Sequence, residues 1–415
     1  MLKARILSPT PAPAATASRR LRIAFLHPEL GLGGAERLVV DAALELQQRG
    51  HTVALFTATH DRARAFPETT DGSLDVRVYG ARLPARLVSR MQVACTIARV
   101  GWTAGKLGLG GDAFDVVVAD VIPYGLPLLR GLRAVGIAAS TKLVYYCHYP
   151  DQLLAPGRTG LYRLYRAPFD ALEVPAMRAA DRVVCNSQFT ARALARLGGG
   201  DAAVVYPGVD IQKHAAVPEL RGDEAMVLVL GRFDRRKNVP LVIDAVARLR
   251  ATAPAAFARI SLVVAGGLDP RQPEDAAVAA ALTDQARRLG IADKVTLCKS
   301  PNESQRLELL ARSLCVVHAA IDEHFGLVPV EAMSAARPVI AVASAGPLET
   351  IVDGATGFLR EPTADAFASA LATLLNDPGR AASMGRAARL HAATRFSRQA
   401  FGAALEAQLL GVVGQ

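Results

Sequence analysis

Two glutamates that follow a strand-like run are the strongest candidates for chemistry in this sequence. Glu323 and Glu331 enclose the segment His324-Phe-Gly-Leu-Val-Pro-Val330. A carboxylate accepts hydrogen bonds from sugar hydroxyl groups, so the pair suits a hydroxyl-rich ligand. A helix expected to begin near Gly326 would direct the backbone N–H groups of Phe325, Gly326, Leu327 and Val328 at an anion.

A basic turn provides a second candidate site. In Gly231-Arg-Phe-Asp-Arg-Arg-Lys-Asn238 the cations stand between a strand-like run and a helix. Arginine offers a planar fork to a diphosphate, and lysine offers a point charge. We expect Arg232 and Lys237 to bind such a group, and Arg235 and Arg236 to be solvated. A charged turn without a ligand is the alternative.

The first half of the chain carries a glycine turn and a histidine, each after a strand-like run. Backbone N–H groups at Gly33 and Gly34 could approach a phosphate, although a turn without a ligand explains the glycines equally well. The turn lacks both the dinucleotide fingerprint and the Lys-Ser/Thr of a P-loop. His148 either lines a cleft or is structural, and Asp151 nearby could orient or charge its imidazole. Ser187 is expected to cap a helix.

Alternating strand and helix patterns would position these residues. Helical stretches such as 35–48, 188–197, 239–251 and 274–289 separate the short apolar runs. The pattern predicts an α/β protein with two doubly wound, Rossmann-like domains facing each other across a cleft. The expected strands are 22–27, 52–57, 75–79, 115–119, 142–147, 181–185 and 202–206, then 226–230, 260–265, 294–298, 315–319 and 338–342.

Length and composition agree with two soluble domains. The chain has 415 residues, 51% of them apolar and 21% charged. We expect a flexible tail over 1–20, domains over 21–210 and 224–395, and a C-terminal helix over 396–415 that packs back toward the first domain. The cysteines are scattered without a CxxC motif, which argues against a disulfide framework or a zinc site and favours buried thiols.

The positive charge suggests an anionic partner. Nearly all of the net charge of +10 lies in the first half of the chain, which favours a membrane surface or a phosphorylated ligand. Nucleic acid is not expected, because no dense basic run is present. Arg82, Arg86 and Arg90 recur at helical spacing in an acid-free stretch, which predicts an interfacial helix on anionic lipid. A helix docked on the sheet with a solvated basic edge is the alternative.

These motifs resemble those of the retaining glycosyltransferases of family 4, which have the two-domain GT-B architecture. The family's E-x7-E motif matches Glu323–Glu331, its diphosphate-binding pair matches Arg232 and Lys237, and its glycine turn matches Gly33-Gly34. Tyr146-Cys-His-Tyr-Pro-Asp-Gln-Leu-Leu154 is similar to the members that assemble dolichol-linked oligosaccharides. The resemblance covers residues 22–401. The sequence departs from the family pattern at Ala345, where a second glycine is usual. Residues 83–109 match the family only loosely.

The resemblance implies transfer of mannose from GDP-mannose to a mannosyl-chitobiosyl-diphosphodolichol, first in α-1,3 and then in α-1,6 linkage. The reaction would take place at the cytosolic face of the endoplasmic reticulum membrane, with other glycosyltransferases of the pathway as possible partners. No metal or other cofactor is expected. Alternatives are another family 4 enzyme with a different sugar nucleotide or lipid acceptor, and a catalytically silent nucleotide-sugar-binding subunit.

The resemblance also implies a role for each residue. The first domain would bind the acceptor and the second the donor, and the catalytic residues would be Glu323, His148, Arg232 and Lys237. Arg232 and Lys237 would hold the diphosphate, Glu331 the ribose and Glu323 the mannose. The backbone of Phe325, Gly326, Leu327 and Val328 would assist, Gly33 and Gly34 would lie near the phosphate, and His148 and Asp151 would line the acceptor site.

Overall fold

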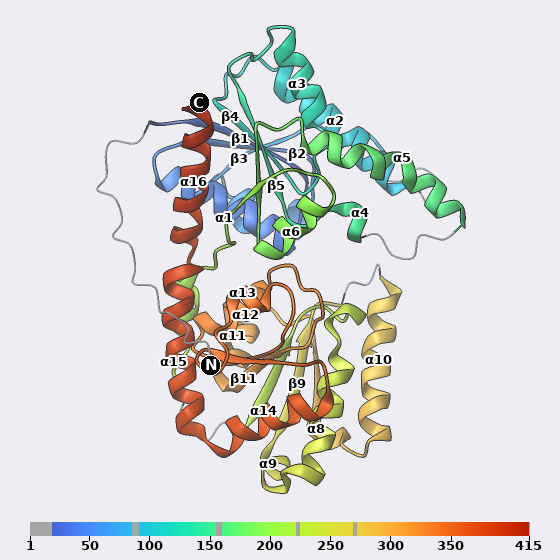
Figure 1. The fold of residues 1–415 in the computed structure, drawn as a ribbon, viewed down its shortest axis with the longest axis vertical. Helices are drawn as coiled ribbons and strands as arrows, with labels where there is room; N and C mark the ends of the chain where they lie inside the picture. The colour runs from blue at the N-terminus through green and yellow to red at the C-terminus, as the bar shows by residue number, and fades with distance from the viewer. Residues whose placement is uncertain (1–18, 85–90, 155–159, 221–224, 269–271, 415) are drawn as a thin grey trace.

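The computed structural model describes residues 19–84, 91–154, 160–220, 225–268 and 272–414. Figure 1 shows two α/β lobes, one above the other, with helices α15 (Pro378–Arg395) and α16 (Arg398–Val413) running along one side of both. Within these residues, no helix is both long and apolar enough to cross a membrane.

The first domain is built on a seven-stranded parallel sheet with the order β3-β2-β1-β4-β5-β6-β7. The order reverses between β1 and β4, and ligands of such sheets bind where this reversal leaves a crevice. Its strands are β1 (Arg22–Leu30), β2 (Thr52–His60), β3 (Asp75–Val78), β4 (Val116–Asp120), β5 (Lys142–Cys147), β6 (Arg182–Cys185) and β7 (Ala202–Val204). Its helices are α1 (Gly34–Gln48), α2 (Gln92–Leu109), α3 (Leu126–Ala134), α4 (Asp151–Leu154), α5 (Gly160–Met177) and α6 (Gln188–Arg196).

The second domain repeats this plan with a six-stranded parallel sheet in the order β10-β9-β8-β11-β12-β13. Its switch point lies between β8 and β11. The strands are β8 (Met226–Leu230), β9 (Ser261–Gly266), β10 (Val295–Lys299), β11 (Ser313–His318), β12 (Val339–Val342) and β13 (Gly357–Arg360). The helices are α8 (Val239–Thr252), α9 (Pro254–Arg259), α10 (Pro273–Arg288), α11 (Glu303–Arg312), α12 (Leu327–Ser334), α13 (Pro347–Thr350) and α14 (Ala364–Asn376).

The predicted fold class is confirmed, with local differences. The short edge strand β13 was not predicted, and the segment between the two expected domains contains the short helix α7 (Ile211–Ala215). The prediction of a helical basic face is wrong at Arg82, which lies in an exposed turn, because helix α2 begins only at Gln92. Arg86 and Arg90 lie outside the described residues. The cysteines are free and buried, except that Cys298 is only half-buried.

The last helix returns to the first domain. Phe401, Leu405 and Leu409 of α16 are buried in the same apolar cluster as helix α1 and strand β1. The two helices touch at Gly402, where an added Cβ would lie 1.9 Å from Glu45 Cγ. Glu406 accepts hydrogen bonds from Arg49 at 3.0 Å and from His51 at 2.9 Å. The end of the chain therefore covers one face of the first sheet.

This packing predicts the effect of truncating the helix α16 core. Leu405→Ala and Leu409→Ala should each lower the free energy of unfolding by about 2–5 kcal/mol, because each leaves a cavity in the first domain. Urea unfolding followed by the fluorescence of Trp102, the only tryptophan, reports this domain. Leu390→Ala is the matched control, since Leu390 is 71% exposed. Equal losses in the control and in the core variants would contradict the packing.

Candidate functional site

Glu323 lies between strand β11 and helix α12, at the switch point of the second sheet. Its Oε2 accepts a hydrogen bond of 2.6 Å from Lys237 Nζ. The buried His318 Nε2 is 3.3 Å from the same oxygen without a well-directed hydrogen bond. Burial opposes ionisation of Glu323, but His318 and Lys237 outweigh it and hold the pKa of the carboxyl well below its usual range. The structure therefore brings two predicted site residues together as an ion pair.

The basic turn after β8 is held in place by glycines. A Cβ on Gly266 would lie 1.5 Å from the carbonyl oxygen of Gly231, so only glycine lets the ends of β8 and β9 approach this closely. Arg236 donates from Nε and Nη2 to Asp234 Oδ2, at 3.1 and 2.7 Å. Arg232 makes a longer contact of 3.3 Å with Asp234 and is half exposed. Arg232 is therefore the less tightly paired guanidinium of the two, although Arg236 is the more exposed, at 69% against 50%.

Helix α12 begins at the same edge of the sheet. Gly326 precedes it with φ +90°, a left-handed conformation that favours glycine, and offers no side chain to cap the helix. The backbone N–H groups of the first turn therefore lack a side-chain cap. Phe325, which precedes the glycine, is buried. This is the geometry that the sequence predicts for an anion-binding turn.

The turn at Ala345 and Gly346, directly before helix α13, supports the Glu323 segment. The backbone N–H of Gly346 donates to the carbonyl oxygen of Glu323 at 2.8 Å. A Cβ on Gly346 would lie 2.5 Å from Phe325 Cα, which requires glycine there. Ala345 has φ +51°, a left-handed conformation that costs a non-glycine residue about 1–2 kcal/mol. Ala345, which stands where a second glycine is usual, therefore lies at a strained position. Glycine would adopt this backbone conformation without cost.

Glu331 lies on the wall of a cavity of about 130 Å³ between the two domains. Arg306 Nη2 on helix α11 donates to its Oε2 at 2.9 Å. The wall also includes Leu327, Asp210 and His214. Glu331 can therefore face a polar ligand while its charge is balanced by an arginine that sequence reasoning did not identify.

His148 belongs to a buried cluster at the switch point of the first sheet. Its Nε2 is 2.7 Å from Asp120 Oδ1, and His27 Nδ1 is 2.7 Å from Asp120 Oδ2. The Asp120 side chain is 1% exposed, and that of His148 is 22% exposed. One buried carboxylate therefore fixes two imidazoles, and only His148 reaches solvent.

The charges of this cluster depend on each other. Burial disfavours the ionised carboxylate of Asp120, but His148 and His27 outweigh it and hold the pKa well below its usual range. Burial also disfavours a charged His148, yet Asp120 and the nearby Glu36 raise the pKa of its ring above the usual value of 6.5. His148 is therefore prepared to carry a proton near neutral pH.

Asp151 does not orient His148, so that prediction is wrong. Its Oδ2 instead accepts a hydrogen bond of 2.6 Å from Arg166, whose side chain is 3% exposed. Asp120 is the partner of His148 because β4 and β5 are adjacent parallel strands whose carboxyl ends meet. Asp151 remains close in sequence to His148, at the start of helix α4.

The glycine turn of the first domain faces the second domain. A Cβ on Gly34 would lie 3.5 Å from Leu327 Cδ1, at the start of helix α12. The carboxylate of Glu36 folds back over Gly33, where an added Cβ would be 2.2 Å from Glu36 Oε2. A phosphate can therefore reach this turn only if the Glu36 side chain moves.

Two contacts join the domains beside the candidate residues. His324 stacks on Tyr149 with ring centroids 3.8 Å apart and planes 10° apart. Burial lowers the pKa of His324 to about 4, so the stacked ring is neutral. Because Tyr149 follows His148 and His324 follows Glu323, this stack brings the two halves of the site together.

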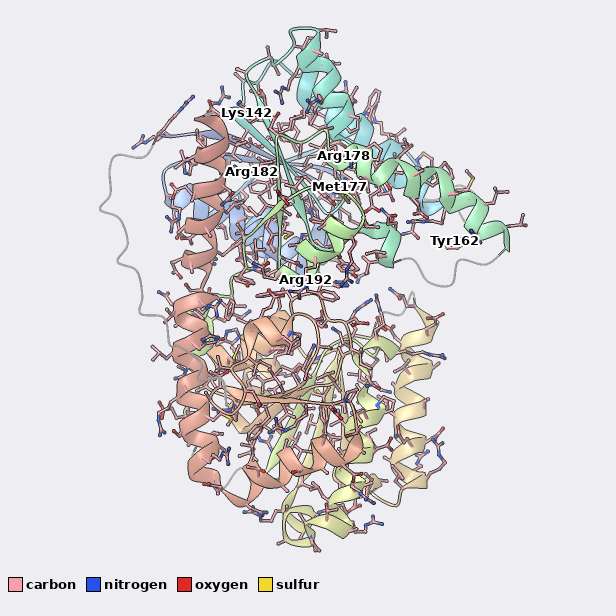
Figure 2. The ribbon with its side chains drawn as sticks, viewed as in Figure 1. Lys142, Tyr162, Met177, Arg178, Arg182 and Arg192 are labelled. Atoms are coloured by element: carbon pink, nitrogen blue, oxygen red, sulfur yellow. The ribbon has the colours of Figure 1, made fainter. Side chains whose placement is uncertain are left out.

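The second contact joins Glu349 to helix α6. The Glu349 carboxylate accepts from the backbone N–H of Gln188 at 2.7 Å and of Phe189 at 2.8 Å, and from the Tyr206 hydroxyl at 3.1 Å. Figure 2 shows Arg192 of α6 at the edge of the first domain that faces the second. Ser187 caps α6 by accepting from Thr190 N, as predicted.

Sequence reasoning missed Asp120, His27, His318, Arg306 and Glu349. Asp120 ends a buried strand at the sheet edge that bears His148. His148 is a candidate because it follows the carboxyl end of such a strand, and the same criterion applies to Asp120. Arg306 lies on a helix without a distinctive motif, and Glu349 ends the motif Gly346-Pro-Leu-Glu, which gave it no role; only the folded chain places them at the site.

Comparison with known families agrees with this two-part geometry. Residues 32–213 match the model described as Glycosyltransferase Family 4, and residues 210–391 match Glycosyl transferases group 1. The chain is 38% identical over 394 residues to the α-1,3/1,6-mannosyltransferase ALG2 of Homo sapiens, covering 91% of this chain and 93% of the relative. It is 34% identical over 411 residues to the protein of the same name in Dictyostelium discoideum, covering 92% and 96%.

Solved structures share the fold. A sucrose-phosphate synthase from Thermosynechococcus elongatus superposes with a TM-score of 0.74 at 21% identity, covering 94% of this chain and 98% of that one. Anabaena HepE in complex with UDP and glucose superposes with a TM-score of 0.68 at 23% identity, covering 94% and 99%. These likenesses support the two-domain architecture alone.

Asp120→Asn tests the histidine cluster. Without the carboxylate charge, burial should lower the pKa of His148 below 6.5, and NMR titration of the histidine ring carbons should measure the change. Because the folded pKa is raised, the wild-type pair stabilises the protein below pH about 6.5 and loses this contribution as the pH rises through the folded pKa. His148→Gln assigns the resonance. An unchanged His148 titration in Asp120→Asn would contradict the coupling.

Proposed function

The chain belongs to the α-1,3/1,6-mannosyltransferase family of glycosyltransferases, and on that basis we propose that it transfers mannose from GDP-mannose to a mannosyl-chitobiosyl-diphosphodolichol. The chain is a glycosyltransferase with the GT-B fold. In this proposal it adds an α-1,3 and then an α-1,6 mannose to the lipid-linked precursor of N-glycans. The reaction would take place at the cytosolic face of the endoplasmic reticulum membrane, alongside other glycosyltransferases of the pathway.

The observation that carries this proposal is the charge arrangement across the cleft. Lys237, Arg232 and the uncapped start of helix α12 lie at one switch point, and the carboxylate of Glu323 lies among them. A diphosphate needs positive partners, whereas a hexose needs hydrogen-bond acceptors. Both kinds of group are present there, and His148 lies on the facing domain beside the stacked Tyr149.

The donor would bind to the second domain. Arg232 and Lys237 would hold its diphosphate, the backbone of the first turn of α12 would donate to the same group, and Glu331 would bind the ribose. Glu323 would then contact the mannose hydroxyls. These cations and the helix start neutralise the diphosphate, so the proposal requires no metal or other cofactor for donor binding.

The chemical step would depend on stabilisation of the leaving group. As the bond between mannose and diphosphate breaks, negative charge grows on the diphosphate oxygen, and Arg232 and Lys237 would stabilise it. The same oxygen would help to take the proton from the incoming acceptor hydroxyl on the same face of the sugar, which retains the anomeric configuration. His148, fixed by Asp120, would line the mannose and the acceptor.

Product analysis tests the function. The purified protein should convert a synthetic diphospholipid-linked trisaccharide and GDP-mannose into products with one and then two added mannoses. Linkage analysis should identify α-1,3 followed by α-1,6 bonds. UDP-sugars and ADP-sugars should neither compete nor donate. Transfer from one of those donors, or no transfer in single-turnover conditions, would refute the assignment.

Arg232→Ala and Lys237→Ala test the cation pair. Each should lower turnover roughly a hundredfold, because one charge contact to a leaving group contributes about 3 kcal/mol to the transition state. Circular dichroism and the urea midpoint should stay close to the wild type for Arg232→Ala, since Arg232 is half exposed. Arg236→Ala is the matched control, because its guanidinium binds Asp234 within the same turn. Near-wild-type turnover in Arg232→Ala or Lys237→Ala would remove that residue from the mechanism.

A further inference from the structure

Helix α5 buries most of its charged side chains, whereas three of its leucines are exposed. Among its charged residues, the Arg166, Asp170 and Glu173 side chains are mostly shielded, with Arg166 3% and Asp170 12% exposed. By contrast, Leu161 is 83%, Leu164 72% and Leu172 56% exposed. A helix on the surface of a soluble protein normally has the opposite arrangement.

The inward face is a built polar network. Arg166 Nη2 donates to Asp151 at 2.6 Å and to Asp170 at 2.8 Å. Glu173 accepts from the backbone N–H groups of Asp151 and Gln152 at 2.6 and 2.9 Å, which holds helix α4 against α5. The orientation of α5 is therefore fixed by buried charge pairs, and its outward leucines follow from that orientation.

The outward side chains form one continuous stripe. Leu161, Leu164, Pro168 and Leu172 follow helical spacing along a single side, and Ala167 and Ala171 beside them are also exposed. We call this set of six residues the apolar face of α5. Tyr162, 40% exposed, stands at the projecting end of the helix, away from the sheet (Figure 2). Scattered exposed leucines are ordinary, but an aligned row indicates a binding surface.

We propose that the apolar face of α5 lies in the boundary between head groups and acyl chains of a lipid bilayer. This inference rests on the proposed function and deepens it, because it assigns the surface that docks the enzyme where its lipid-linked acceptor resides. It differs from the basic stretch around Arg82 that the sequence favoured. The helix would lie on the membrane, with its charged network facing the protein.

Charge favours lipid over a protein partner. Both acids of α5 are turned inward, whereas Arg163 is exposed at the flank of the apolar face. The adjacent helix α2 is joined to α5 by a hydrogen bond of 3.1 Å from Ala94 N to the Tyr165 hydroxyl, and it contains no acid. An exposed tryptophan of α2, Trp102, has Lys106 over its ring at 5.1 Å. Apolar, aromatic and basic side chains with few acids match an anionic bilayer surface.

The position of the apolar face also suits the substrate. Leu153 and Leu154 of helix α4, which is held against α5, are also exposed, at 46% and 41%. Helix α4 begins at Asp151, two residues after the Tyr149 that stacks across the cleft. A lipid-linked acceptor could therefore keep its acyl chain near α5 while its sugar reaches the histidine.

Vesicle flotation tests the proposal with the full-length protein. The triple variant Leu161→Gln/Leu164→Gln/Leu172→Gln should lower partitioning onto phosphatidylcholine vesicles containing about one third phosphatidylserine by about tenfold or more. Its urea midpoint should be unchanged, because the three side chains are exposed. Leu390→Gln is the matched control, since Leu390 is 71% exposed on another helix and should bind like the wild type.

Several outcomes would overturn the proposal. It is wrong if the wild type does not float with these vesicles, or if the triple variant floats as well as the wild type. It is also wrong if the triple substitution only dissociates an oligomer in sedimentation analysis while lipid binding persists, which would make the apolar face a protein interface.

Activity assays separate this inference from the proposed function. The triple variant should transfer mannose to a short-chain, water-soluble acceptor like the wild type, but should lose about tenfold with a long-chain acceptor in vesicles. Loss with both acceptors would contradict a docking role. If no mannosyl transfer occurs at all, the proposed function fails, while flotation still decides whether α5 binds lipid.

Discussion

The contact between Lys237 and Glu323 is the interaction on which the candidate site depends. It joins a turn after the first strand of the second sheet to the loop after the fourth, so it spans the switch point. The buried His318 lies against the same carboxylate, and the Gly346 N–H binds the backbone of Glu323. An acid with such partners stays ionised and fixed before a ligand arrives. Preorganised charge of this kind is what transition-state stabilisation requires.

In the first domain, one buried carboxylate fixes the side chains at the switch point of the sheet. The ionised carboxylate of Asp120 is 1% exposed, and burying such a charge without partners would be unfavourable. Two imidazoles are its partners. The result is a histidine of raised pKa at the cleft. Across the cleft, burial keeps His324 neutral, so the ring can stack on Tyr149 without a desolvated charge. Two histidines close to each other thus have opposite protonation tendencies, set by their different surroundings.

Helix α5 shows how buried polar groups can determine what a surface exposes. Arg166 and Glu173 hold helix α4 in place, and their network fixes α5 with its leucines toward the outside. The same arrangement therefore connects the neighbourhood of His148 with the surface proposed to bind lipid. Stability of the domain and the proposed binding of lipid therefore depend on one set of contacts.

The sequence by itself determined the fold class and the loops after the strands that carry Glu323, His148 and the basic turn. Buried parallel strands appear in the sequence as short apolar runs. Turns in which backbones approach closely contain glycines. Both features can therefore be recognised from local sequence. Only the tertiary structure decided that Asp120, and not Asp151, holds His148. It also decided that Glu349 binds helix α6 and that the leucines of α5 face outward. These features depend on which residues meet after distant segments pack together, and spacing along the chain does not encode that.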